Sequence, residues 1–286
     1  MPTASINGVD LYYEVTGEGE PLAWSHEFAG DHRSWAPQVR AFARRYRVIT
    51  YSNRGYPPSS VPDDPAAYSQ EQLVDDLRGL LEHLGIARAH VGGLSMGGNV
   101  ALNFALTYPE MCRCAIVAGC GTGSNDPETF RAEGRRLIAA IEGEGMAGFT
   151  AVYAMGPTRR QFARKDPLGW REFRDQLAGH SARGAALVFG NVQLKRPTIY
   201  QLQPKLEALT VPTLIVVGDE DEPCLAPGLF MKRHIRSAGL AILPDTGHTL
   251  NLEEPELFNR LALDFLTAVE QGRWPVREEA GTEKLF

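Results

Sequence analysis

The stretch Gly93-Leu94-Ser95-Met96-Gly97 decides how the rest of this chain is interpreted. The residues before it, Ala89–Gly92, are partly apolar and end in glycine, which is typical of the end of a buried strand. The residues after it, Gly98–Leu106, carry apolar side chains three and four positions apart, which predicts a helix. A serine on a sharp turn between a strand and a helix is the context in which this pattern presents a nucleophile.

The outer glycines of the pattern have a physical purpose. A serine held at positive φ brings the residues two before and two after it close to neighbouring backbone, and glycine at 93 and 97 avoids that crowding. A glycine-rich turn carrying a solvent-exposed serine is the competing interpretation. The flanking strand and helix favour the nucleophile.

An acid and an imidazole follow further along the chain. The aliphatic run Thr213–Val217 predicts a strand buried on both faces, and it ends at Gly218-Asp219-Glu220-Asp221. Carboxylates at that point stand where open α/β sheets keep their sites. A second short strand, Leu240–Leu243, is followed by Pro244-Asp245-Thr246-Gly247-His248. The order serine, acid, histidine distinguishes one hydrolase fold from the others.

With these three pieces the chain resembles the α/β-hydrolase superfamily, in its serine-nucleophile, capped branch of esterases, lactonases and C–C hydrolases. The resemblance runs from about Ile6 to about Ala268, and it includes Trp24–Phe28 as the oxyanion loop and Asn53–Tyr56 as the loop after the fourth strand. It implies an α/β fold with a mostly parallel central sheet, helices on both faces and a helical cap. The chain departs from the family at Glu27, where glycine is usual, at Asn53, where aspartate is usual, and at Pro57-Pro58.

The resemblance assigns a role to each site residue. Ser95 attacks a carbonyl, His248 accepts its proton and returns it to the leaving group, and Asp221 holds and stabilises the imidazole. Asp221 is preferred because the family's acid usually stands three residues after the glycine that ends the strand; Asp219 and Glu220 are the alternatives. The backbone N–H groups of Phe28 and Met96 are expected to form the oxyanion hole.

Glu27 admits two interpretations. In the first, its side chain points away from the oxyanion hole and pairs with an arginine such as Arg33 or Arg54. In the second, it lies in the pocket with a raised pKa and handles protons or a polar group of the substrate. Trp170 is a further candidate pocket residue, one of several aromatic side chains expected in the cap.

The alternation of strands and helices divides the chain into a core, a cap and a tail. Residues 1–121 and 205–270 are expected to form the core, and residues 122–204, which lack a convincing strand pattern, a helical cap or lid. Predicted cap helices are Glu128–Glu142, Ala147–Met155, Leu168–Leu177 and Ala182–Phe189. Residues 271–286 are polar and predict a flexible tail.

Composition excludes several classes of function. The chain has 286 residues, 43% of them hydrophobic, and a net charge of −6, which does not suggest a nucleic-acid partner. It has no apolar stretch of membrane-spanning length, no secretion signal and four cysteines, so we expect a cytoplasmic protein with no membrane partner. No zinc spacing, dinucleotide fingerprint or phosphate loop appears, so no metal and no cofactor are expected. The expected partner is a small-molecule substrate, and a homodimer stays open.

Three functions remain compatible with the sequence. The first is a carboxylic-ester hydrolase (EC 3.1.1) that acts on small to medium apolar acyl or alkyl substrates through an acyl-enzyme. The second keeps the triad but cleaves a lactone or a C–C bond next to a ketone, or carries out cofactor-free perhydrolysis. The third is a ligand receptor or pseudo-enzyme of this fold. Relatives with an aspartate nucleophile are disfavoured, because Ser95 occupies that position.

Overall fold

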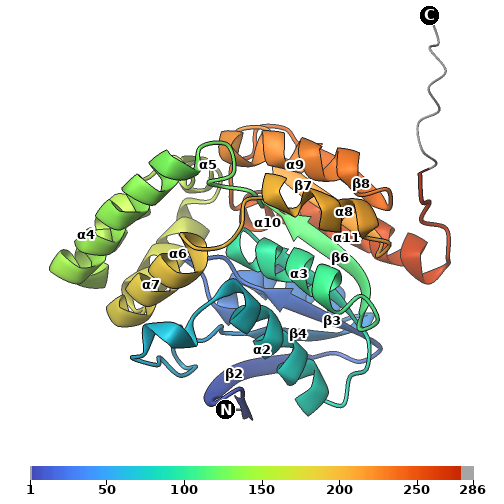
Figure 1. Cartoon of the computed structure of the whole chain (residues 1–286), viewed down its shortest axis with the longest axis horizontal. Coiled ribbons are helices and arrows are strands. Elements are labelled where there is room, and N and C mark those ends of the chain that lie inside the picture. The colour runs from blue at the N-terminus through green and yellow to red at the C-terminus, as the bar shows by residue number, and fades with distance from the viewer. Residues whose placement is uncertain (1, 278–286) are drawn as a thin grey trace, which may run out of the picture.

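A computed structural model describes residues 2–277. Eight strands form one sheet in the order β1-β2-β4-β3-β5-β6-β7-β8, and every pairing from β4 to β8 is parallel (Figure 1). The strands are β1 Thr3–Ile6, β2 Val9–Thr16, β3 Glu20–Ser25, β4 Tyr46–Tyr51, β5 Ala89–Leu94, β6 Cys112–Ala118, β7 Thr213–Gly218 and β8 Ala238–Leu243. This architecture confirms the predicted fold class.

The first hairpin was not expected from the sequence. Strand β1 pairs antiparallel with β2, and Ile6 faces Val9 across the turn Asn7-Gly8. Both turn residues have positive φ, 49° and 78°, which is the conformation that an Asn-Gly pair favours in a two-residue hairpin. The signal was therefore present in the sequence, but β1 is only four residues long.

Helices cover both faces of the sheet and enclose two apolar layers. The face of α2 (Gln70–His83), α3 (Met96–Thr107) and α9 (Glu222–His234) packs against side chains such as Val91 and Ile215. The opposite face is covered by α1 (Ala36–Phe42) and α11 (Pro255–Glu270), over Trp24 and Ile116. The remaining core helices are short: α8 (Gln203–Ala208) and α10 (Leu250–Glu253). Among residues 2–277, no helix combines the length and apolar character that crossing a membrane requires.

The cap helices gather beside the sheet and not within its layers (Figure 1). They are α4 (Pro127–Tyr153), α5 (Arg160–Lys165), α6 (Pro167–Ala178) and α7 (Ala182–Val188). Helix α4 is interrupted at Gly145, whose φ of 68° is not helical. That break separates the two helices that the sequence predicted there. The division between core and cap at residues 122 and 204 stays a prediction.

Residues 271–277 do not behave as the flexible tail that was expected. The Trp274 indole N–H donates a hydrogen bond of 2.7 Å to the Ser237 carbonyl, and its ring meets Phe265 edge-on at 4.6 Å. This segment is therefore held against the core. The rest of the predicted tail, residues 278–286, lies outside the described residues.

Candidate active site

The turn from β5 to α3 holds Ser95 in a conformation that few residues adopt. Ser95 has φ 55° and ψ −109°, directly before the first residue of α3. A Cβ on Gly93 would lie 2.1 Å from the Gly97 carbonyl oxygen, and a Cβ on Gly97 would lie 1.9 Å from the Ser25 carbonyl oxygen. Only glycine fits at these two positions. The Ser95 N–H donates to the Ala118 carbonyl oxygen at 2.8 Å, which fixes the turn to strand β6.

The acid and the imidazole meet at the same edge of the sheet. Asp221 follows β7, His248 lies in the loop after β8, and His248 Nδ1 is 2.8 Å from Asp221 Oδ2. Asp219 instead accepts the Thr246 N–H at 3.0 Å, and Glu220 accepts from Gln161 at 2.7 Å. The structure thus brings Asp221, and neither alternative carboxylate, to the imidazole.

Glu253 holds the histidine loop in place, a residue to which the sequence assigned no role. Its carboxylate is buried and accepts the N–H groups of Gly247 and Thr249, at 2.6 and 2.9 Å, on either side of His248. The chain also passes very close to β7, since a Cβ on Gly218 would lie 2.2 Å from the Thr246 carbonyl oxygen. The hydrogen bonds from Glu253 and the close approach of Gly218 to Thr246 therefore fix the position of the His248 loop.

The charges at this pair favour a general base. Burial opposes protonation of His248, but the Asp221 carboxylate and its hydrogen bond outweigh burial and raise the pKa of His248. Burial alone would raise the pKa of Asp221, yet the charge and hydrogen bond of His248 lower it. With Nδ1 turned to Asp221, the other ring nitrogen, Nε2, is left to accept a proton.

Ser95 and His248 line the same cavity. Within residues 2–277 no hydrogen bond joins the Ser95 hydroxyl to the imidazole of His248. Of the two contacts that a triad needs, the hydrogen bond between Asp221 and His248 is the one that is formed. Catalytic hydrogen bonds of this kind are often long without substrate and tighten when it binds. The structure thus places Ser95 and the imidazole of the Asp221–His248 pair around one cavity.

One group of side chains has the composition of a metal site. Asp221, Cys224 and His248 offer ligand atoms within 4.8 Å of one another. However, the Asp221 and His248 atoms are hydrogen-bonded to each other, and burial raises the pKa of the Cys224 thiol well above its usual value. A protonated thiol is a poor ligand. This donor set fits the hydrogen-bonded pair better than it fits a metal ion.

His26 orients the loop expected to supply the oxyanion hole. Its Nδ1–H donates to the Glu27 carbonyl oxygen at 2.7 Å, and its Nε2 accepts the Asn53 N–H at 3.0 Å. Burial lowers the pKa of His26 to about 4, so the ring is neutral. Because the carbonyl and N–H of one peptide point in opposite directions, holding the Glu27 carbonyl also sets the direction of the Phe28 N–H.

Two amides near the serine are free to bind an oxyanion. Neither the Phe28 N–H nor the Met96 N–H has a hydrogen-bond acceptor in the described part of the chain. Met96 is the first residue of α3, where backbone N–H groups lack partners within the helix. Phe28 lines the cavity that contains Ser95. These are the properties that an oxyanion hole requires.

Glu27 is buried and paired, but not with the arginines expected from the sequence. Arg33 pairs with Asp31, and Arg54 pairs with Asp76. Glu27, 1% exposed, forms an ion pair with Arg159, which is fully buried in the cap.

The surroundings of Arg159 hold that pair in place. Its guanidinium lies 5.2 Å from the ring centre of Tyr153 and 5.0 Å from that of Phe173, and it donates to the Thr158 carbonyl oxygen at 2.9 Å. The pair therefore neutralises a carboxylate next to the oxyanion loop and ties that loop to the cap.

The cavity at Ser95 has a volume of about 210 Å³. This is below the roughly 300–1,000 Å³ of sites for drug-sized ligands, so the site suits a small substrate. Its aromatic wall is made by Phe28, Phe130, Tyr153 and Phe189.

Trp170, a predicted pocket residue, lies outside this described lining. Its indole N–H donates to the Ala154 carbonyl oxygen at 2.7 Å, so it fastens the cap. Sequence analysis also gave no role to three polar residues of the lining: Thr122, Gln193 and Arg196.

Comparison with known proteins places this geometry in a family. A sequence model described as "Alpha/beta hydrolase family" matches residues 19–261, and the chain belongs to that family. The chain is 28% identical to 3-oxoadipate enol-lactonase 1 of Acinetobacter baylyi, over 92% of this chain and 95% of that protein.

Two solved structures of relatives extend the comparison. The enol-lactonase from Burkholderia xenovorans has a TM-score of 0.83 and 28% identity, over 93% of this chain and all of that one. A thermophilic esterase from Thermogutta terrifontis, with malate bound, has a TM-score of 0.83 and 27% identity, over 94% and 98%.

The imidazole of His248 is expected to titrate above its ordinary value of 6.5, because Asp221 favours the charged form. An Asp221→Asn variant removes the main charge that opposes the effect of burial, so the pKa of His248 should fall. Nuclear magnetic resonance titration of the ring protons measures the pKa of His248 in the wild-type protein and in the variant. Asp219→Asn is the control, and an equal shift in the two variants would contradict the assignment of Asp221.

Arg159→Gln is expected to destabilise the protein by about 3–5 kcal/mol, because it leaves the Glu27 carboxylate buried without its partner. The double variant Glu27→Gln with Arg159→Gln should recover part of that loss, as a double-mutant cycle of denaturant unfolding would show. Arg174→Gln, at a mostly exposed pair, should change the free energy of unfolding by less than about 1 kcal/mol. A double variant no more stable than Arg159→Gln would refute the coupling.

Proposed function

We propose that this protein is a serine hydrolase that cleaves small carboxylic esters through a Ser95–His248–Asp221 triad and an acyl-enzyme. One observation carries the proposal: a hydrogen-bonded Asp221–His248 pair shares a cavity with a serine at φ 55° on a strand–helix turn. The apolar wall of Phe130 and Phe189 suits the hydrocarbon part of an acyl or alkyl group.

The reaction follows from the positions of these groups. His248 Nε2 accepts the hydroxyl proton as Ser95 Oγ attacks the ester carbonyl carbon, and Asp221 stabilises the imidazolium. The negative charge that develops on the carbonyl oxygen is bound by the Phe28 and Met96 N–H groups, each worth about 3 kcal/mol at such sites. His248 then protonates the leaving alkoxide, and the acyl-enzyme remains. Water, activated by the same imidazole, releases the acid and restores Ser95.

Lactone hydrolysis is the second candidate, and the comparisons favour it. The relatives of similar length and structure include enzymes named enol-lactonases. A lactone needs no new catalytic group, because the same attack opens the ring and the alcohol stays attached to the acyl group. The cavity of about 210 Å³ is compatible with a small ring. A receptor without turnover is less well supported, because a receptor has no need of two unoccupied amides beside a paired imidazole.

Turnover of 4-nitrophenyl acetate, butyrate and hexanoate tests the proposal directly. Ser95→Ala should lower kcat by about 10³-fold or more, because removal of the nucleophile leaves only oxyanion stabilisation and binding. Ser5→Ala, on the exposed side of β1, is the control and should retain wild-type turnover. A Ser95→Ala variant with more than about a tenth of the wild-type rate would place the nucleophile elsewhere.

A parallel assay with γ-butyrolactone and δ-valerolactone, followed by acid release, separates the two candidates. A higher kcat/KM for the lactones than for the aliphatic esters would make the protein a lactonase. Wild-type protein that turns over neither class would contradict both and favour the receptor.

A further inference from the structure

Arg196 is a partly buried cation that has no carboxylate partner among the described residues. It lies between the cap and α8, and its Nη2 donates to the Thr122 carbonyl oxygen at 3.1 Å. Its Nη1 is buried and has no hydrogen-bond acceptor. No acidic side chain of residues 2–277 lies within ion-pairing distance of its guanidinium.

The two fully buried arginines of the described residues are each paired with a carboxylate, Arg54 with Asp76 and Arg159 with Glu27. Arg196 is less deeply buried than these two and has no such partner. Burial of an unpaired charge is costly, and it lowers the pKa of the Arg196 guanidinium. A protein that tolerates such a cost commonly uses the group for binding.

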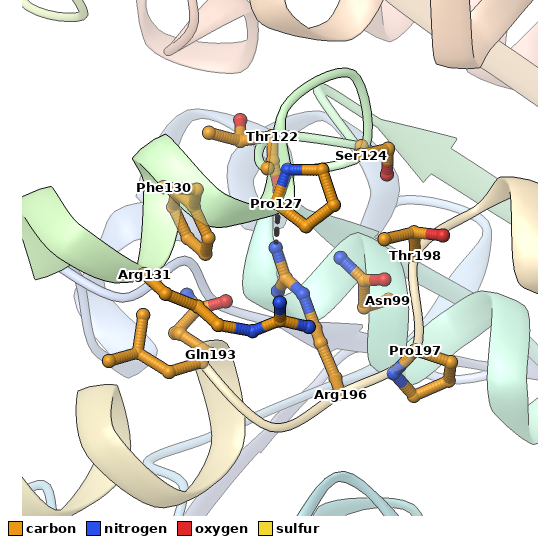
Figure 2. Close-up of a pocket in the computed structure, with 13 residues that line it drawn as sticks. Asn99, Thr122, Ser124, Pro127, Phe130, Arg131, Gln193, Arg196, Pro197 and Thr198 are labelled. Atoms are coloured by element: carbon orange, nitrogen blue, oxygen red, sulfur yellow. Dashed lines mark hydrogen bonds between the residues drawn. The ribbon is translucent and has the colours of Figure 1, made fainter.

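Arg196 belongs to the lining of the catalytic cavity. Arg196 lines the cavity that contains Ser95 and His248, and it also lines an adjoining cavity of about 20 Å³. Figure 2 shows its side chain directed toward Thr122, with Arg131 and Gln193 around the same space. Gln193 is buried, and its side-chain amide oxygen has no hydrogen-bond donor among the described residues.

The chemistry of the guanidinium favours a carboxylate as its ligand. The adjoining space has room for only about one water-sized group, so a bound carboxylate has to lie in the larger cavity that contains Ser95. A guanidinium binds a carboxylate through two parallel N–H donors. Glu133, the acidic residue of the cavity lining, is exposed and forms no ion pair with Arg196.

We propose that Arg196 binds a carboxylate of the substrate, so that the preferred substrate is an ester or lactone that carries a second, ionised carboxyl group. The inference rests on the proposed function, because Ser95 must receive the scissile carbonyl in the same cavity. The hydrocarbon between the two groups lies against Phe130 and Phe189. The two ends of the substrate are then recognised by different chemistry.

Matched substrate pairs test this subsite. Mono-4-nitrophenyl adipate is compared with 4-nitrophenyl hexanoate, and 4-carboxyphenyl hexanoate with phenyl hexanoate, so that the carboxylate is on the acyl or the alcohol side. Wild-type protein should prefer the anionic member of at least one pair by about tenfold or more in kcat/KM. Arg196→Gln should reduce that preference to near one, and Arg196→Lys should keep part of it. Arg136→Gln, an exposed cap residue, removes the same charge and should leave the preference unchanged.

Two further measurements separate this proposal from a structural role and from the proposed function. Calorimetric binding of monomethyl adipate to Ser95→Ala protein should weaken by about tenfold or more when Arg196→Gln is added, and this readout needs no turnover. Arg196→Gln should not lower the free energy of unfolding, because it removes an unpaired buried charge. Anionic and neutral substrates that fall equally in Arg196→Gln, or no preference in the wild type, would overturn the subsite while leaving the hydrolase intact. If the wild-type protein showed no Ser95-dependent turnover while monomethyl adipate still bound in an Arg196-dependent way, only the proposed function would be overturned.

Discussion

The site depends on a contact between two stretches of backbone. Gly97, in the first turn of α3, lies so close to the end of β3 that a single Cβ would come within 1.9 Å of the Ser25 carbonyl oxygen. That contact holds the loop of His26, Glu27 and Phe28 against the turn that carries Ser95. Because the proposed oxyanion donors and the proposed nucleophile belong to different segments, their relative position is only as exact as this approach.

Electrostatic balance is the second organising feature. Asp221 is paired with His248 on one side of the cavity, and Glu27 is paired with Arg159 beside the oxyanion loop. The Glu27 pair keeps negative charge away from the place where the oxyanion develops, and it does so with a residue of the cap. Oxyanion loop and cap are therefore joined electrostatically. Arg196 differs from these groups because its charge has no acidic counterpart in the described residues, which makes it available to a ligand.

Much of this arrangement was predictable because it depends on local sequence. The pattern around Ser95 predicted the strand, turn and helix that the structure shows, and the spacing from Gly218 predicted the carboxylate that meets His248. Partners far apart in the chain were not predictable. Glu27 and Arg159 are 132 residues apart, so Arg33 and Arg54 were natural but incorrect choices. Arg196 follows the last predicted cap helix in a segment with no periodicity. Trp170 was predicted to line the pocket as one of several aromatic side chains of the cap, whereas its indole N–H is hydrogen-bonded to the Ala154 carbonyl oxygen.

The central claim is that Ser95 is activated by His248 and forms a covalent adduct with an electrophile at carbon or phosphorus. Reaction with a fluorophosphonate, followed by mass spectrometry of the digested protein, tests it most directly. The account predicts one adduct per chain on the peptide that contains Ser95, with its rate of formation reduced by about 10³-fold or more in His248→Ala. An adduct on another residue, or labelling of Ser95 at the same rate without the imidazole, would contradict it.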